Sequence, residues 1–253
     1  TTANGSVDVL TTGALTVNTV NNINGITANG EGGVKLTGGT NVLVGTGVDL
    51  LQSVSGGGDI TIAGKSSTEW GVRIGGGNTV KTTNAVGNTS TVTITGASAS
   101  KSAVAVIGEV QTNNGSTLSI EGTASNGAKG IYSELTTTGS NYGKIGSATS
   151  GAVTLIGTST GGSDNALGTD AMLNGGYGVL LRGNVTSQGK ISITGTADYQ
   201  PGVFLQQSTY DYGRTMAETQ PTIQVVSGGA AIAGDAIYIQ GTNLRGGTVN
   251  KNG

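Results

Sequence analysis

A short strand pattern recurs along this chain and limits what it can fold into. In Gly189-Lys190-Ile191-Ser192-Ile193-Thr194-Gly195-Thr196, apolar and hydroxyl side chains alternate over a few residues and then reach a glycine. Such alternation is typical of a short strand with one buried face and one wet face. Copies occur at Asp59-Ile60-Thr61-Ile62-Ala63-Gly64, Thr91-Val92-Thr93-Ile94-Thr95-Gly96, Thr117-Leu118-Ser119-Ile120-Glu121-Gly122 and Ala152-Val153-Thr154-Leu155-Ile156-Gly157, with a weaker copy at Thr222-Ile223-Gln224-Val225. The pattern therefore indicates an internal repeat.

The spacing of these copies sets the length of one repeat. Counted from the first buried residue, the copies start at Val7, Val34, Ile60, Val92, Leu118, Val153, Ile191, Ile223 and Val249, and the shortest interval is 26 residues. A second strand follows 12 or 13 residues later in several repeats, at Gly71-Val72-Arg73-Ile74, Ala103-Val104-Ala105-Val106, Gly130-Ile131-Tyr132 and Gly202-Val203-Phe204-Leu205. A third apolar patch comes later, as at Val80, Ile145 and Val185.

Three short strands per repeat, with no room for a helix between them, predict an all-β fold. The expected architecture is a right-handed parallel β-helix, a solenoid of about eight laps of 26 or more residues. A β-sandwich is the alternative, but its hairpin-connected strands need not recur at equal phase. We expect residues 1–253 to form a single β-helical repeat array, an excerpt of a longer chain, with loop insertions near 158–177 and 206–220. The inward columns are expected to be Ile60, Ile62, Val92, Ile94, Leu118, Ile120, Val153, Leu155, Ile191 and Ile193.

Glycine and asparagine are expected at the corners of each lap. Gly64, Gly96, Gly122, Gly157 and Gly195 each follow the alternating segment, so we interpret them as one corner column in which glycine adopts positive φ. Asn21-Asn22 and Asn113-Asn114 are expected to form ladders of hydrogen-bonded amides between stacked laps.

The composition excludes several classes of function. With no His and no Cys, the chain lacks the residues of common nucleophilic triads and zinc sites. Its net charge is −2 and its 12 Lys and Arg residues are scattered, which argues against nucleic acid as a partner. It has no apolar stretch of 18 residues, so no membrane span is expected in this segment.

The carboxylates do not point to catalysis. Asp59, Glu69, Glu109, Glu121 and Glu134 fall at different phases of the lap, so we expect no enzyme. The competing hypothesis is a polysaccharide-processing β-helix such as a lyase or tailspike, which would need two carboxylates facing one groove.

One loop carries oxygen-bearing side chains of the kind that bind calcium. Oxygen ligands occur in Gly161-Gly162-Ser163-Asp164-Asn165 and at Asp170, but this loop lacks the Gly-Gly-x-Gly-x-Asp repeat of calcium-binding toxins. We therefore expect a solvated loop and no cofactor.

The outward face of the first strand carries a hydroxyl-rich column of the kind found on ice-binding faces, made of Thr61, Thr93, Ser119, Thr154, Ser192 and Gln224. Its neighbouring column, Ala63, Thr95, Glu121, Ile156, Thr194 and Val226, is irregular, so we interpret these residues as strand formers on a wet face.

The repeat unit resembles that of known bacterial exoproteins. Gly-x-Val-Thr-Ile-x-Gly-Thr, a Gly/Ser-rich loop, Gly-Val-x-Leu and a short valine patch together resemble the repeats of filamentous haemagglutinin-type exoproteins and of autotransporter passengers. Asn22-Ile23-Asn24-Gly25-Ile26 looks like the Asn-Pro-Asn-Gly-Ile element of the family's secretion domain, but with Ile in place of Pro, so no secretion domain is assigned. The resemblance implies an extracellular or cell-surface stalk, associated with the outer membrane, that serves adhesion, cell aggregation or biofilm formation.

The second insertion, with the nearby Tyr199, holds the residues most suited to ligand contact. Tyr199, Tyr210, Tyr212 and Arg214 form the densest aromatic cluster of the sequence, and aromatic platforms with a few polar partners suit sugars or proteins. The expected partner is a cell-surface glycan or protein. A third class of function is a self-assembling filament or matrix subunit, in which copies of the chain associate end to end or laterally through exposed strand edges.

Overall fold

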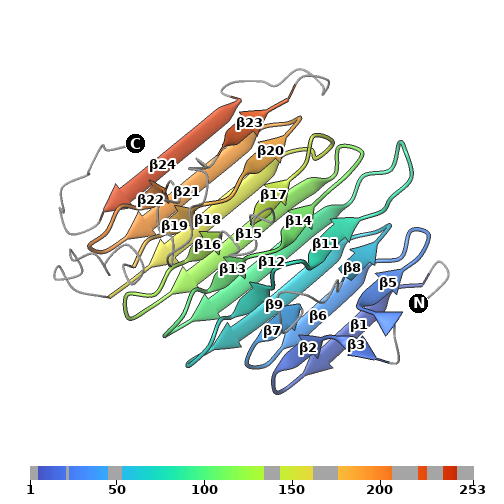
Figure 1. Cartoon of the computed structure of the whole chain (residues 1–253), viewed down its shortest axis with the longest axis horizontal. Coiled ribbons are helices and arrows are strands. Elements are labelled where there is room, and N and C mark those ends of the chain that lie inside the picture. Colours follow the sequence, from blue (N-terminus) through green and yellow to red (C-terminus); the bar gives the residue numbers. More distant parts are fainter. Residues whose placement is uncertain are drawn as a thin grey trace, which may run out of the picture.

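The strands wind into a coil that adds one strand to each of three sheets on every lap (Figure 1). The structure is a computed structural model, and it describes residues 5–20, 23–44, 53–133, 143–161, 176–206, 222–226 and 236–243. These residues form strands and turns, and no helix occurs among them. The predicted parallel β-helix with three strands per lap is confirmed.

Each sheet collects equivalent strands from successive laps. The first sheet contains β1 (Val7–Thr11), β6 (Val34–Gly38), β9 (Ile60–Ser66), β12 (Thr91–Ser98), β15 (Thr117–Ala124), β18 (Val153–Ser159), β21 (Ile191–Ala197) and β24 (Ile237–Asn243). The second contains β2 (Leu15–Val17), β7 (Val42–Val44), β10 (Val72–Ile74), β13 (Val104–Val106), β16 (Ile131–Ser133), β19 (Val179–Leu181) and β22 (Val203–Leu205). The third contains β5 (Ile26–Ala28), β8 (Ser53–Gly56), β11 (Thr79–Thr82), β14 (Glu109–Gln111), β17 (Lys144–Gly146), β20 (Val185–Ser187) and β23 (Ile223–Val225). A separate antiparallel pair, β3 (Thr19–Val20) and β4 (Ile23–Asn24), lies near the start of the chain.

The core is a set of aliphatic columns in strict register. All ten predicted inward residues of the first sheet are at most 1% exposed, and strand pairing aligns Ile62 with Ile94 and Ile94 with Ile120. The second and third sheets contribute their own columns to the same continuous core, for example Val72 and Val110. Each lap therefore buries its apolar face against its neighbours, as expected for a solenoid.

One predicted strand belongs to a different sheet. Ile223 was expected to start a first-sheet strand, but β23 pairs with β20 in the third sheet. The first-sheet strand of that lap is β24, which aligns Ile237 with Ile191 and Gly241 with Gly195. The expected outward residues Gln224 and Val226 are therefore wrong, and Tyr238 and Gln240 occupy those columns. Val249 lies outside the described residues.

The glycine column is real, but its role differs from the prediction. Gly64, Gly96, Gly122, Gly157 and Gly195 pair in register, yet each lies inside a first-sheet strand, and none has a positive φ. A Cβ on Gly157 would lie 2.0 Å from the carbonyl oxygen of Gly178, just before the second-sheet strand. Glycine is required here because two backbone segments approach closely, not because the chain turns.

Polar side chains fill the turn between the third and first sheets. Ser116 is fully buried, and its Oγ lies 3.1 Å from Asn84 Nδ2, 3.0 Å from the Ser90 amide nitrogen and 3.3 Å from Ser90 Oγ. Thr82 Oγ1 donates to Asn113 Oδ1 at 2.7 Å, and Asn114 Nδ2 donates to the Asn84 carbonyl at 2.8 Å. The side chains of Asn113 and Asn114 therefore do bridge neighbouring laps, but they bond to a hydroxyl and to a backbone carbonyl and not to other side-chain amides, as the predicted ladder required. Asn21-Asn22 lies outside the described residues.

Candidate functional site

Of the four predicted contact residues, the structure describes only Tyr199. It is half-buried in the turn between β21 and β22. Tyr210, Tyr212 and Arg214 lie outside the described residues, so their predicted clustering stays a prediction. Thr158 and Ser159 continue β18 in register with β21. Most of the insertion expected near 158–177 lies outside the described residues, so it stays a prediction.

A group of aromatic and basic side chains lies along the second sheet, and we call it the aromatic–cationic band. Its first part is centred on Trp70, the only tryptophan of the chain, which directly precedes Gly71 and β10. Lys101 Nζ lies 4.0 Å from the centre of the Trp70 ring system, and Arg73 Cζ lies 5.1 Å from it. Lys101 also pairs with Glu69 at 2.6 Å. Strand alternation explains the position of Arg73, because its neighbours Val72 and Ile74 are both buried in the core.

The second part of the band is centred on Tyr132, the middle residue of β16. Lys129 Nζ lies 5.5 Å and Arg182 Cζ 5.8 Å from the Tyr132 ring centre. Arg182 Nη1 donates to the Tyr132 hydroxyl at 3.3 Å, and Arg182 Nε donates to Gln206 Oε1 at 2.8 Å. Two rings thus each hold two cations, an arrangement in which the ring quadrupole attracts the positive charge.

An aromatic stack extends the same side of the coil. The rings of Tyr177 and Phe204 lie 5.2 Å apart with an interplanar angle of 12°. Burial raises the pKa of the Tyr177 hydroxyl above its ordinary value, and the nearby Arg182 charge opposes this rise. The stack is therefore a neutral, largely buried end to the aromatic row.

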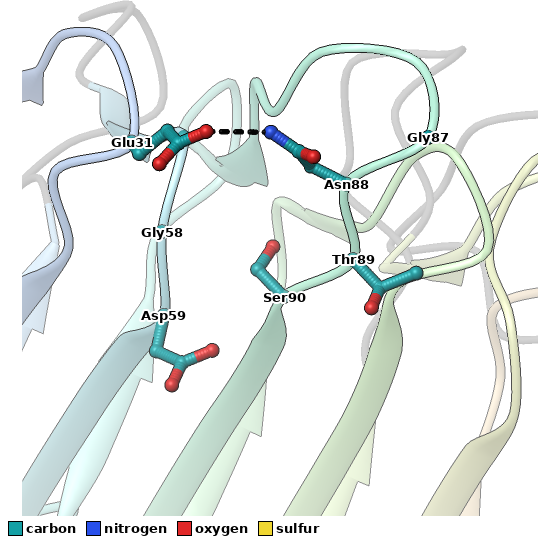
Figure 2. A pocket seen from close by; sticks show the side chains of 8 residues that line it. Glu31, Gly58, Asp59, Gly87, Asn88, Thr89 and Ser90 are labelled. Carbon is teal, nitrogen blue, oxygen red and sulfur yellow. Dashed lines mark hydrogen bonds between the residues drawn. The ribbon is translucent and has the colours of Figure 1, made fainter.

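A polar cleft lies at the turn between the third and first sheets. Figure 2 shows Glu31, Asp59 and Asn88 around it, contributed by neighbouring laps, and its volume is about 480 Å³. Asn88 Nδ2 donates to Glu31 Oε1 at 2.7 Å. Asp59 Oδ1 accepts a hydrogen bond from the Thr91 amide at 2.8 Å. Both carboxylates therefore support the stacking of laps.

The remaining acids considered in the sequence analysis lie apart from this cleft. Glu69 pairs with Lys101 beside the second sheet, whereas Glu109 pairs with Lys144 at 2.8 Å on the third. Glu121 is on the outward face of the first sheet, opposite Ile156. Glu134 lies outside the described residues. Sequence reasoning did not consider Glu31, which is the second carboxylate of the cleft.

A metal centre has no support in the part of the chain that the structure describes. No three His, Cys, Asp or Glu side chains gather there. Of the loop weighed as a calcium site, only Gly161 is described, and its amide donates to Asp198 Oδ2 at 2.7 Å. Asp164 and Asp170 lie outside the described residues.

The hydroxyl-rich face of the first sheet is interrupted. The column Thr61, Thr93, Ser119, Thr154 and Ser192 is in register, and a further column that sequence reasoning missed contains Thr123, Thr158, Thr196 and Thr242. Between these two columns stand Glu121 and Ile156, whose longer side chains are exposed. The face is thus not a flat array of hydroxyls.

The band around Trp70 and Tyr132 was also missed from the sequence. A signal was present, because Trp70 and Lys129 each stand two residues before the first buried residue of a second-sheet strand.

Comparison with known proteins does not identify a family, because the chain matches no protein-family model, no curated protein and no solved structure. No helix of the described residues has the length and apolar character that a membrane-spanning helix needs.

Proposed function

We propose that this chain is a stalk segment of a secreted or surface-displayed bacterial exoprotein, with weak adhesive sites along its sides and no catalytic role. The observation that carries the proposal is the unbroken register of the first sheet, in which eight strands stack over one continuous aliphatic core. Seven steps of about 4.8 Å give this sheet a length of roughly 34 Å. A rod of this kind keeps each binding site on its side faces at a fixed distance from its ends, as a stalk must.

Adhesion through such a rod depends on many weak contacts. A single aromatic contact contributes about 1 kcal/mol, which is useful only when many copies engage one surface together. The predicted insertions near 158–177 and 206–220 and the aromatic–cationic band are the places where such contacts would occur. The haemagglutinin-type resemblance of the repeat supports the same role.

The test compares beads that carry the chain at high density with beads that carry a variant lacking residues 207–218. Both proteins should show the same strand-type circular dichroism and nearly equal melting temperatures. The variant beads should adhere less to bacterial or host cell surfaces. Undiminished adhesion after both insertions and Trp70 are removed would show that the chain is a spacer without adhesive contacts.

The polar cleft favours a second candidate, a polysaccharide-processing β-helix. Glu31 and Asp59 both line one cleft, and glycan hydrolysis uses a pair of carboxylates on either side of the bond that is cleaved. Incubation with a panel of polysaccharides, followed by measurement of released reducing ends, decides between the two. Activity that disappears in Asp59→Asn and Glu31→Gln would replace the stalk proposal, and no release of sugar from any polymer would remove this candidate.

A further inference from the structure

The aromatic–cationic band carries positive charge in a pre-arranged form. Lys101 and Arg73 share the Trp70 ring, so their charged groups lie no more than about 9 Å apart. Lys129 and Arg182 share the Tyr132 ring in the same way. A cation held against a ring keeps its full charge and loses side-chain freedom before any ligand arrives, which lowers the entropic cost of binding an anion.

The two parts of the band are carried by strands of the same sheet. Arg73 of β10 pairs with Ala105 of β13, which pairs with Tyr132 of β16, so the two groups are two strands apart. Strand spacing places the backbones of Arg73 and Tyr132 about 10 Å apart along the rod. An anionic ligand that contacts both would therefore lie across the strands, parallel to the axis of the rod.

We propose that this band binds an acidic polysaccharide, a chain of sugars that carries carboxylate or sulfate groups. The inference rests on the proposed adhesive function and names the class of ligand for it. Lys101, Arg73, Lys129 and Arg182 bring four cationic groups to the band, and ammonium and guanidinium groups form charge-assisted hydrogen bonds with carboxylates and sulfates. The chain as a whole has a net charge of −2, so attraction of an anion must come from a local group of this kind and not from overall charge.

A nucleic acid fits the band less well. Double-stranded DNA carries one negative charge per about 1.7 Å of helix axis and is held by dense basic surfaces. Two pairs of cations carried two strands apart suit a sparser polyanion, because the charges of an acidic polysaccharide are limited to its sugar units.

The chain offers a closely matched control for a test of this inference. Lys101 pairs with Glu69 at 2.6 Å inside the band, and Lys144 pairs with Glu109 at 2.8 Å on the third sheet. The two lysine side chains are 39% and 41% exposed. Lys101→Gln and Lys144→Gln therefore make the same change in net charge at similar depth, but only the first removes a cation of the band.

Binding to immobilised polygalacturonate, a sulfated dextran, neutral dextran and double-stranded DNA should be measured at low ionic strength by biolayer interferometry. We expect the chain to bind one or both acidic polysaccharides and not neutral dextran. Lys101→Gln should weaken this binding about fivefold, as expected for loss of one charge-assisted contact. Glu69→Gln should strengthen it, whereas Lys144→Gln and Glu109→Gln should each leave it within about twofold of the parent chain.

Trp70→Leu tests whether binding depends on how Lys101 and Arg73 are held, because it removes the ring that both contact and leaves the net charge unchanged. It should also weaken binding, with circular dichroism confirming that the strands persist. Equal effects of Lys101→Gln and Lys144→Gln, no binding to either acidic polymer, or tighter binding to DNA would each overturn the inference. Bead adhesion that persists without acidic-polysaccharide binding would overturn this ligand alone and leave the adhesive function in place.

Discussion

The tightest point of the coil is the glycine column of the first sheet. At Gly157 a methyl group would meet a backbone carbonyl at 2.0 Å, and backbone cannot move aside as a flexible side chain can. Gly157→Ala should therefore lower the free energy of unfolding by about 3 kcal/mol or more. Gly13→Ala is the control, because its nearest neighbour would be Thr11 Oγ1 at 4.0 Å. Chemical denaturation should show little loss or a small gain for Gly13→Ala, and equal losses in both variants would contradict this explanation of the column.

Tyr177 gives the chain a specific response to alkaline pH. Burial raises the pKa of its hydroxyl in the folded state above the ordinary value of 10.0, so the folded state favours the neutral form. The stability of the folded state with a neutral Tyr177 is fully present below about pH 10 and is lost as pH rises through the folded pKa, because the tyrosine ionises more easily in the unfolded chain. Tyr177→Phe should remove that part of the loss. Urea denaturation of both proteins at several pH values above about 9 measures this difference. If the two proteins lost stability in parallel, the assignment to Tyr177 would be contradicted.

At the scale of the element, buried hydroxyls hold the turns between the third and first sheets. Ser116 Oγ accepts from the Ser90 amide at 3.0 Å and lies within hydrogen-bonding distance of Asn84. Ser116→Ala would leave these buried groups without that partner, so the free energy of unfolding should fall by about 1–3 kcal/mol. Ser119→Ala alters a half-exposed hydroxyl on the outward face of β15 and should change stability by less than about 0.5 kcal/mol. Thermal melts of the two variants compare them directly, and similar melting temperatures would argue against a stabilising role for the Ser116 hydrogen bonds.

Elements with strong local alternation could be predicted from the sequence, and those set by register could not. The first-sheet strands from β1 to β21 are predictable because each alternates and most contain the glycine that recurs along the repeat. Ile223 was misassigned because its segment lacks that glycine, whereas Ile237-Tyr238-Ile239-Gln240-Gly241-Thr242 repeats the pattern fully. In the band, the contacts of Lys101 with Trp70 and of Arg182 with Tyr132 join different laps, so predicting them required knowledge of which laps meet. Such contacts depend on three-dimensional register and leave little trace in local composition.

At the scale of the whole molecule, the register makes each lap an interchangeable unit. Thr91 pairs with Thr117 and Thr61 with Thr93, so the same outward and inward columns continue from one lap to the next. Ile60 and Ile62 would meet Leu118 and Ile120 if the lap between them were absent, and all four are aliphatic residues of the same core. Stability in such arrays is approximately a sum of repeat and neighbour contributions, so the loss of one interior lap is tolerated.

Deletion of residues 91–116 removes one full lap and joins Ser90 directly to Thr117. The variant should keep a cooperative melt within about 5 °C of the parent, because β9, β10 and β11 can pair with β15, β16 and β17 in the existing register. Deletion of residues 91–103 removes about half as many residues but places second-sheet residues where first-sheet residues belong. That variant should lose cooperative melting and strand-type circular dichroism, since a shift in phase turns apolar residues out of the core. If the half-lap deletion melted as cooperatively as the full-lap deletion, the aliphatic columns would not be what specifies the stacking of this rod.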